Sequence, residues 1–157
     1  MQLHVSLPIV GEKVRREGRY TGWSEPVHGR ELHPLKSIPT TVGKDRARLF
    51  LIDTGGFMNM ISVTTAREVT KVYRDSQTMV KGLSGTVDKI YSADHIELQC
   101  GQVQYYIANE ATLDLVPLSN QIGTEISGVL GTIAFLQLDV RIDYRDGLVD
   151  LAEKPGH

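Results

Sequence analysis

Polar and hydrophobic residues alternate along much of the chain in short stretches, a pattern typical of β-strands. Alternation with a period of two runs through residues 96–100, 103–108 and 138–144, which places successive side chains on opposite faces of a sheet. Residues 48–52 form a segment of strand type in which the four residues after Arg48 are a continuous apolar run. These segments predict a domain built mainly of strands.

Two turns predict β-hairpins between such strands. Asp-Gly at 146–147 is among the dipeptides favoured in two-residue hairpin loops, so the strand before it should return over residues 148–151. Residues 79–91 predict a second hairpin, with glycines at its tip over 82–85.

A single short helix is predicted after the apolar run. Ser62 is a candidate N-cap residue, and Ala66, Val69, Val72 and Tyr73 recur at helical spacing. The predicted fold class is therefore all-β, with one short helix and many turns.

The first part of the chain differs in composition from the rest. Residues 1–34 are rich in Gly, Arg and Glu and are predicted to be an N-terminal arm or linker, followed by one domain over residues 35–157. Residues 1–48 carry nine Lys and Arg against five Asp and Glu, whereas residues 49–157 carry eight against fourteen. A basic arm can dock onto an acidic body, and it leaves nucleic acid as an alternative ligand of the arm.

Length and composition bound the class of protein. The chain has 157 residues, of which 41% are hydrophobic and 23% charged, which fits one globular domain and argues against wholesale disorder, collagen or a coiled coil. No apolar run approaches the roughly 20 residues that cross a bilayer, so no membrane span is expected. The net charge of −2 gives no reason to expect a nucleic acid partner.

Residue types that bind metals or form disulfides are sparse. Cys100 is the one cysteine, so no internal disulfide is possible, and a buried position is expected for it. The five histidines form no pair at helical spacing, and neither a metal nor a cofactor is expected. The first residues lack the pattern of a signal peptide: the compartment is extracytoplasmic if a leader upstream of this chain is missing, and cytoplasmic otherwise.

Asp53 stands at the end of the apolar run and is followed by Thr54, Gly55 and Gly56. A carboxylate after a buried strand is costly unless it is hydrogen-bonded or open to a cleft, and glycines let backbone N–H groups approach it closely. Such a carboxylate is rigid and accessible, which suits acid–base chemistry. The alternative is an Asp that merely ends a strand and caps a turn.

Two more elements follow Asp-Thr-Gly along the chain. Residues 80–87 (Val-Lys-Gly-Leu-Ser-Gly-Thr-Val) have the form of a glycine-rich flap hairpin, and residues 127–132 (Ser-Gly-Val-Leu-Gly-Thr) contain two hydrophobic residues followed by glycine. With these three elements in order, residues 35–151 resemble bacterial retropepsin-like aspartyl protease domains. The resemblance implies a closed β-barrel of the acid protease fold, equivalent to half of a pepsin molecule.

The resemblance also implies an aspartic endopeptidase. In that class two aspartates share one proton, and one acts as a base toward water while the other acts as an acid toward the substrate carbonyl. Because the chain has just one Asp-Thr-Gly, the second aspartate would have to come from a second copy across a two-fold axis. A homodimer and a peptide or protein substrate are therefore the expected partners, with a mildly acidic pH optimum.

The resemblance assigns roles to individual residues. Asp53 would be the catalytic carboxylate, Thr54 would lock the paired loops across the two-fold axis, and Gly55 would give the carboxylate a close backbone contact. Gly131 would allow close packing under this loop. The flap tip that binds the substrate would consist of Gly82, Leu83, Ser84 and Gly85.

Two further interpretations stay open. The chain could be a non-catalytic dimerisation or peptide-binding module that kept the fold, or it could be one domain of a longer protein. Gly56 is a departure from the pattern, because retroviral-type enzymes normally carry Ala at this position.

Overall fold

The computed structural model describes residues 4–8, 36–75, 80–82, 85–87, 90–136, 138–143 and 145–154. The strands in these ranges are β1 (His4–Pro8), β2 (Ser37–Val42), β3 (Ala47–Ile52), β4 (Met60–Ser62), β5 (Val72–Asp75), β6 (Val80–Gly82), β7 (Gly85–Val87), β8 (Ile90–Cys100), β9 (Val103–Leu113), β10 (Gly128–Leu130), β11 (Leu138–Asp143) and β12 (Leu148–Glu153). The helices are α1 (Val63–Val69), α2 (Val116–Ile122) and the 3-10 helix η1 (Thr132–Phe135).

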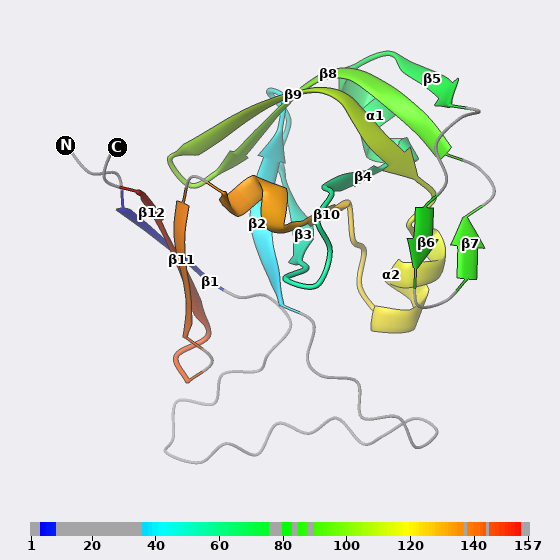
Figure 1. Cartoon of the computed structure of the whole chain (residues 1–157). Coiled ribbons are helices and arrows are strands. Elements are labelled where there is room, and N and C mark those ends of the chain that lie inside the picture. The colour runs from blue at the N-terminus through cyan, green and yellow to red at the C-terminus, as the bar shows by residue number, and fades with distance from the viewer. Residues whose placement is uncertain are drawn as a thin grey trace.

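Six of these strands close into a barrel (Figure 1). The strand order is β2-β3-β10-β4-β9-β8, and β8 pairs with β2 again, where Thr41 lies opposite Gln99 and Val42 opposite Leu98. The barrel is mixed, because β10 runs parallel to β3 and β4 runs parallel to β9 while the other pairs are antiparallel. Closure leaves no open edge within the ring. The prediction of a closed β-barrel is confirmed.

A second, three-stranded sheet has the order β1-β12-β11 and lies beside the barrel at the left of Figure 1. Leu138 from β11 and Leu151 from β12 belong to the same buried cluster as the barrel residues, so this sheet packs on the barrel. The hairpin predicted around 146–147 is confirmed by the pairing of β11 with β12. Strand β1 lies within the predicted arm over 1–34, and the domain boundary at residue 34 stays a prediction.

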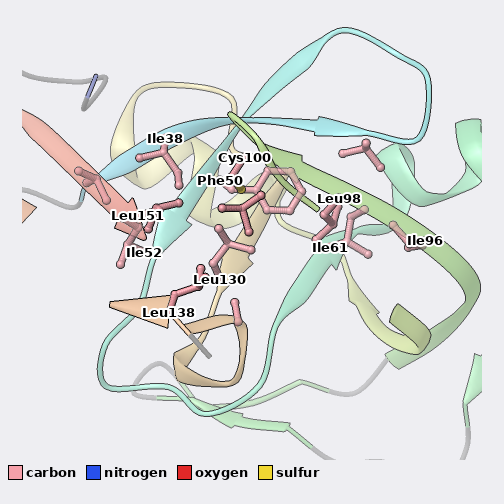
Figure 2. Close-up of a cluster of buried hydrophobic side chains, with 14 of the residues drawn as sticks. Ile38, Phe50, Ile52, Ile61, Ile96, Leu98, Cys100, Leu130, Leu138 and Leu151 are labelled. Atoms are coloured by element: carbon pink, nitrogen blue, oxygen red, sulfur yellow. The ribbon is translucent and has the colours of Figure 1, made fainter. Parts of the chain in front are cut away.

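The main core fills the space enclosed by the barrel (Figure 2). Its fully buried members come from strands on all sides of the ring and include Ile38, Phe50, Ile61, Leu98 and Leu130. The Phe50 ring requires glycine at the facing position of β10, because a Cβ on Gly128 would lie 2.1 Å from a ring carbon. The close approach of β10 to β3 is thus built into the sequence at Gly128.

The second half of β3, Phe50–Ile52, is apolar because both of its faces are covered. Phe50 and Ile52 belong to the main core, whereas Leu51 packs in a second cluster with Ile126 and Val129. This is the physical reason for the continuous apolar run that ends at Asp53.

Helix α2 covers the second cluster with Leu118 and Ile122. The prediction of a single helix was wrong, since α2 is a second one. Its signals are local: Asp114 accepts a hydrogen bond from the N–H of the first helical residue at 3.0 Å, Pro117 lies in the first turn, and Gly123 ends the helix in the left-handed conformation at φ 79°. Each of these residues could have been read from the sequence.

Helix α1 begins where the sequence predicts it. The Ser62 Oγ accepts a hydrogen bond from the Thr65 N–H at 3.2 Å and so caps the helix. The helix ends at Val69, and Val72 and Tyr73, which were predicted to continue it, lie in β5 instead. Within the part of the chain that is described, no helix is long and apolar enough to cross a membrane.

Candidate active site

Asp53 lies directly after β3, at the point where β3 and β10 run side by side. The Asp53 N–H donates a hydrogen bond to the Leu130 carbonyl at 2.9 Å, which continues the parallel pairing of Ile52 with Leu130 by one step. The position of this backbone is therefore set by two buried strands rather than by the loop that follows.

The Asp53 carboxylate is held by the backbone of its own turn. Its Oδ1 accepts hydrogen bonds from the N–H groups of Gly55 and Gly56, each at 3.0 Å. A Cβ on Gly56 would lie 2.6 Å from Oδ2, so the carboxylate rests against the bare Cα of Gly56. Asp53 is half-buried and Thr54 is exposed. The turn thus presents a fixed carboxylate with one oxygen free of these amide bonds, an arrangement that can serve acid–base chemistry.

The loop between β3 and β4, residues 53–59, crosses the end of β10 and is fastened to η1, which follows β10. The N–H of Thr132 donates to the Gly56 carbonyl at 2.8 Å, and the N–H of Ile133 donates to the Phe57 carbonyl at 3.0 Å. These two bonds join the loop to η1.

Gly131 and Asn59 form the tightest part of this junction. A Cβ on Gly131 would lie 2.4 Å from the Met58 carbonyl oxygen, so only glycine fits under the loop, as the resemblance implied. The Gly131 N–H donates to Oδ1 of the buried Asn59 at 3.0 Å. Sequence reasoning assigned no role to Asn59.

Large hydrophobic side chains are exposed beside the candidate site. Phe57 (59% exposed), Met58 (56%), Ile133 (38%) and Leu136 (58%) come from two segments that the Ile133–Phe57 backbone bond holds together. Ile133 and Leu136 are three residues apart and face the same side of a 3-10 turn. We call these four residues the loop patch. A concentration of exposed apolar side chains is typical of a surface that binds a ligand or another protein.

The predicted flap hairpin is present in the backbone. Strands β6 and β7 pair antiparallel, with Gly82 opposite Gly85, and the prediction of a hairpin here is confirmed for these strands. Leu83 and Ser84 lie outside the described residues. The substrate-binding role predicted for Gly82, Leu83, Ser84 and Gly85 stays a prediction.

The Cys100 thiol and the Asp143 carboxylate both lie in surroundings that indicate a structural role. The Cys100 thiol is buried and lies 3.2 Å from Thr40 Oγ1, and burial raises the pKa of this thiol to about 11, so it is not a thiolate at neutral pH. Asp143 Oδ1 accepts hydrogen bonds from the N–H groups of Asp146 and Arg145, which lower the Asp143 pKa. Among the described residues, no group of three or more His, Cys, Asp or Glu side chains is arranged to hold a metal ion.

A hollow on the surface is lined by residues none of which is a predicted site residue. Its lining includes Asp45, Glu68, His95 and Glu97. The Arg48 guanidinium bonds to Asp45 at 2.7 Å and to Glu68, so two of these carboxylates are already paired with one largely buried cation.

This chain has matches among solved structures. Neither the protein-family models nor the curated proteins contain a match to this chain. Among solved structures, the chain is similar to a retropepsin-like aspartic protease from Rickettsia conorii, with 13% identity, a TM-score of 0.48 and coverage of 98% of this chain and 92% of that one. It is also similar to the EIAV protease in complex with the inhibitor HBY-793, with 14% identity, a TM-score of 0.37 and coverage of 62% and 97%.

The closed barrel of the described residues is evident from the strand pairing itself. What the candidate site does is a separate question, which its own geometry has to support.

Proposed function

We propose that this chain is an aspartic endopeptidase that acts as a homodimer, with one Asp53 from each copy. The observation that carries the proposal is the state of the Asp53 carboxylate: it follows a buried strand, it is half-buried, and two amide N–H groups fix its Oδ1. Capping of the turn alone would account for those two bonds. It would not account for the exposed Thr54 or for the loop patch beside it, which favour a surface that binds a partner.

In the proposed reaction the two Asp53 carboxyl groups share one proton. The ionised group takes a proton from a water molecule as the water oxygen attacks the peptide carbonyl carbon, and the protonated group donates its proton to the carbonyl oxygen. The tetrahedral intermediate then collapses as the C–N bond breaks. The nitrogen takes a proton from the protonated carboxyl group, and the other carboxylate takes a proton from a hydroxyl group of the intermediate, which restores the single shared proton of the dyad. Thr54, exposed on the same turn, would bond across the two-fold axis and align the two loops.

The flap would complete the site. Strands β6 and β7 form a short hairpin whose tip would close over an extended peptide and exclude water. An extended peptide can bind by main-chain hydrogen bonds, with pockets selecting its side chains. In this proposal the flap tip and the loop patch are the two parts of the chain that would contact the substrate peptide.

The experiment that tests the proposal is the Asp53→Asn substitution. Cleavage of a peptide library should fall on the order of 1,000-fold or more, because a catalytic acid–base group is removed, while dimerisation and the thermal unfolding midpoint are retained. The matched control is Asp139→Asn, the same chemical change at an exposed position on β11, which should leave cleavage unchanged.

The loop patch also favours a second candidate function, a non-catalytic dimerisation or peptide-binding module. Exposed Phe57 and Met58 would serve binding whether or not the bound peptide is cut. If this alternative holds, the wild-type chain cleaves no peptide in the library, and Asp53→Asn binds peptides as tightly as the wild type.

A further inference from the structure

One peptide group connects Asp53 to a buried side chain on the other side of β10. The carbonyl of Leu130 accepts the Asp53 N–H at 2.9 Å, and the N–H of Gly131, which belongs to the same peptide group, donates to Asn59 Oδ1 at 3.0 Å. Because a peptide group is planar and rigid, a change in the direction of its N–H also changes the direction of its C=O.

We propose that Asn59 is a positioning residue for Asp53: its side-chain oxygen fixes the Leu130–Gly131 peptide group, and that group fixes the backbone of Asp53. The inference rests on the proposed function for its catalytic consequence, but the positioning itself is a property of the fold. It adds a residue to the site that Asp-Thr-Gly does not contain.

The other fastenings of the loop do not depend on side chains. The bonds from Thr132 and Ile133 to the loop, and the bond from Asp53 to Leu130, join backbone atoms only. Asn59 supplies the one side-chain acceptor among the bonds described between the loop and residues 130–133. Asn59 is buried, with the residue 6% exposed.

Burial makes this acceptor hard to replace. If the Asn59 oxygen is removed, the N–H of the buried Gly131 loses its acceptor, and a buried donor without a partner is unfavourable. The peptide group is then expected to tilt toward another acceptor. Gly131 cannot move toward the loop, because the Met58 carbonyl already lies against its Cα, so the tilt would be passed to Leu130 and Asp53.

Two variants separate the oxygen from the shape of the side chain. Asn59→Asp keeps an oxygen in the position of Oδ1, and Asn59→Leu keeps a similar volume but removes the acceptor. Ile96→Val, a small core change on β8, is the control for a general loss of stability. Should Asn59→Leu fail to fold, Asn59→Ala removes the same acceptor without a branched side chain.

The first measurement is independent of catalysis: the NMR chemical shifts of the Gly55 and Gly56 amide protons, which report their bonds to the Asp53 carboxylate. We expect these shifts to change in Asn59→Leu and to stay near wild-type values in Asn59→Asp and Ile96→Val. Unchanged shifts in Asn59→Leu would overturn the inference, whether or not the wild type cleaves peptides.

The second measurement is steady-state cleavage. We expect Asn59→Leu to lower kcat roughly 10- to 100-fold with KM within about two-fold, because misplacement of a reacting group slows chemistry more than binding, and Asn59→Asp to recover most of kcat. An equal loss of kcat in Ile96→Val and Asn59→Leu would reduce Asn59 to a structural role. Changed amide shifts in a chain whose wild type cleaves nothing would support the positioning role and contradict the proposed function.

Discussion

Gly131 lies against the carbonyl group of Met58 so closely that a Cβ on Gly131 would be 2.4 Å from the Met58 oxygen. This contact brings the end of β10 beneath the loop that carries Asp53. It explains why glycine is needed at position 131, which lies 78 positions after Asp53 in the sequence. The segment around Gly131 contributes no functional side chain to the candidate site.

Gly131→Ala is therefore expected to destabilise the fold. The atoms in the way are backbone atoms whose neighbours are fixed by the bonds from Thr132 and Ile133, so the free energy of unfolding should fall by about 2–3 kcal/mol, in the range of overpacked sites. Urea unfolding measures it.

Gly123→Ala is the matched control for this substitution. A Cβ on Gly123 has open space around it, but the residue has φ 79°, so its cost should be limited to about 1 kcal/mol of left-handed backbone strain. An equal or greater loss of stability in Gly123→Ala would contradict the steric explanation at Gly131.

Gly56→Ala should act on the carboxylate rather than on the fold. Its Cβ would lie 2.6 Å from Asp53 Oδ2, whereas a Cβ on Gly55 would lie 3.4 Å from Oδ1. We expect Gly56→Ala to turn the carboxylate away from its amide donors and to lower kcat roughly 10-fold, with a change of less than about 1 kcal/mol in the free energy of unfolding.

Gly55→Ala serves as the comparison in the same assay and should lower kcat less than Gly56→Ala does. Full activity of Gly56→Ala would mean that the Asp53 carboxylate works in a rotated position. The contact between the carboxylate and Gly56 would then have no part in catalysis, and the role of the amide bonds to Oδ1 would stay open to test.

Glu110 makes the stability of the fold depend on pH. The residue is buried on β9, and burial raises the pKa of its carboxyl group to about 7 from an ordinary value of 4.5. In the folded state the group holds its proton up to higher pH than in the unfolded state, so stability is highest below about pH 4.5 and falls as the pH rises through 7.

Glu110→Gln should remove this dependence. At pH 8 the variant is expected to be more stable than the wild type by up to about 3 kcal/mol, and at pH 4 the two should be equal within about 1 kcal/mol. Unfolding free energies from pH 4 to 8 test this, with Glu125→Gln at an exposed position as the control. A wild-type stability that rises between pH 5 and 8, with no gain from Glu110→Gln, would contradict the assignment.

Local patterns were sufficient to predict much of the fold. The apolar run before Asp53 predicted β3, the Ser62 cap predicted the start of α1, and the Asp-Gly turn predicted the pairing of β11 with β12. In each case the deciding interaction lies within a few residues of the signal, or depends only on a face that must be buried.

The errors have physical reasons. Val72 and Tyr73 continue the helical spacing of α1, but pairing of β5 with β8 removes them from the helix, which is a tertiary effect that spacing does not report. Asn59 escaped notice because the group it binds, the Gly131 N–H, is 72 residues away in the chain. Only the interleaving of β10 between β3 and β4 brings the two together.

The central claim is that catalysis needs one Asp53 from each of two chains. We would mix wild-type protein with an equal amount of Asp53→Asn protein, at a concentration where both are dimeric and chains exchange, and measure peptide cleavage. If both aspartates are needed, random pairing leaves a quarter of the dimers active, and cleavage should fall to about half of that given by the same amount of wild type alone. Cleavage that stays at the wild-type level after exchange would contradict the claim.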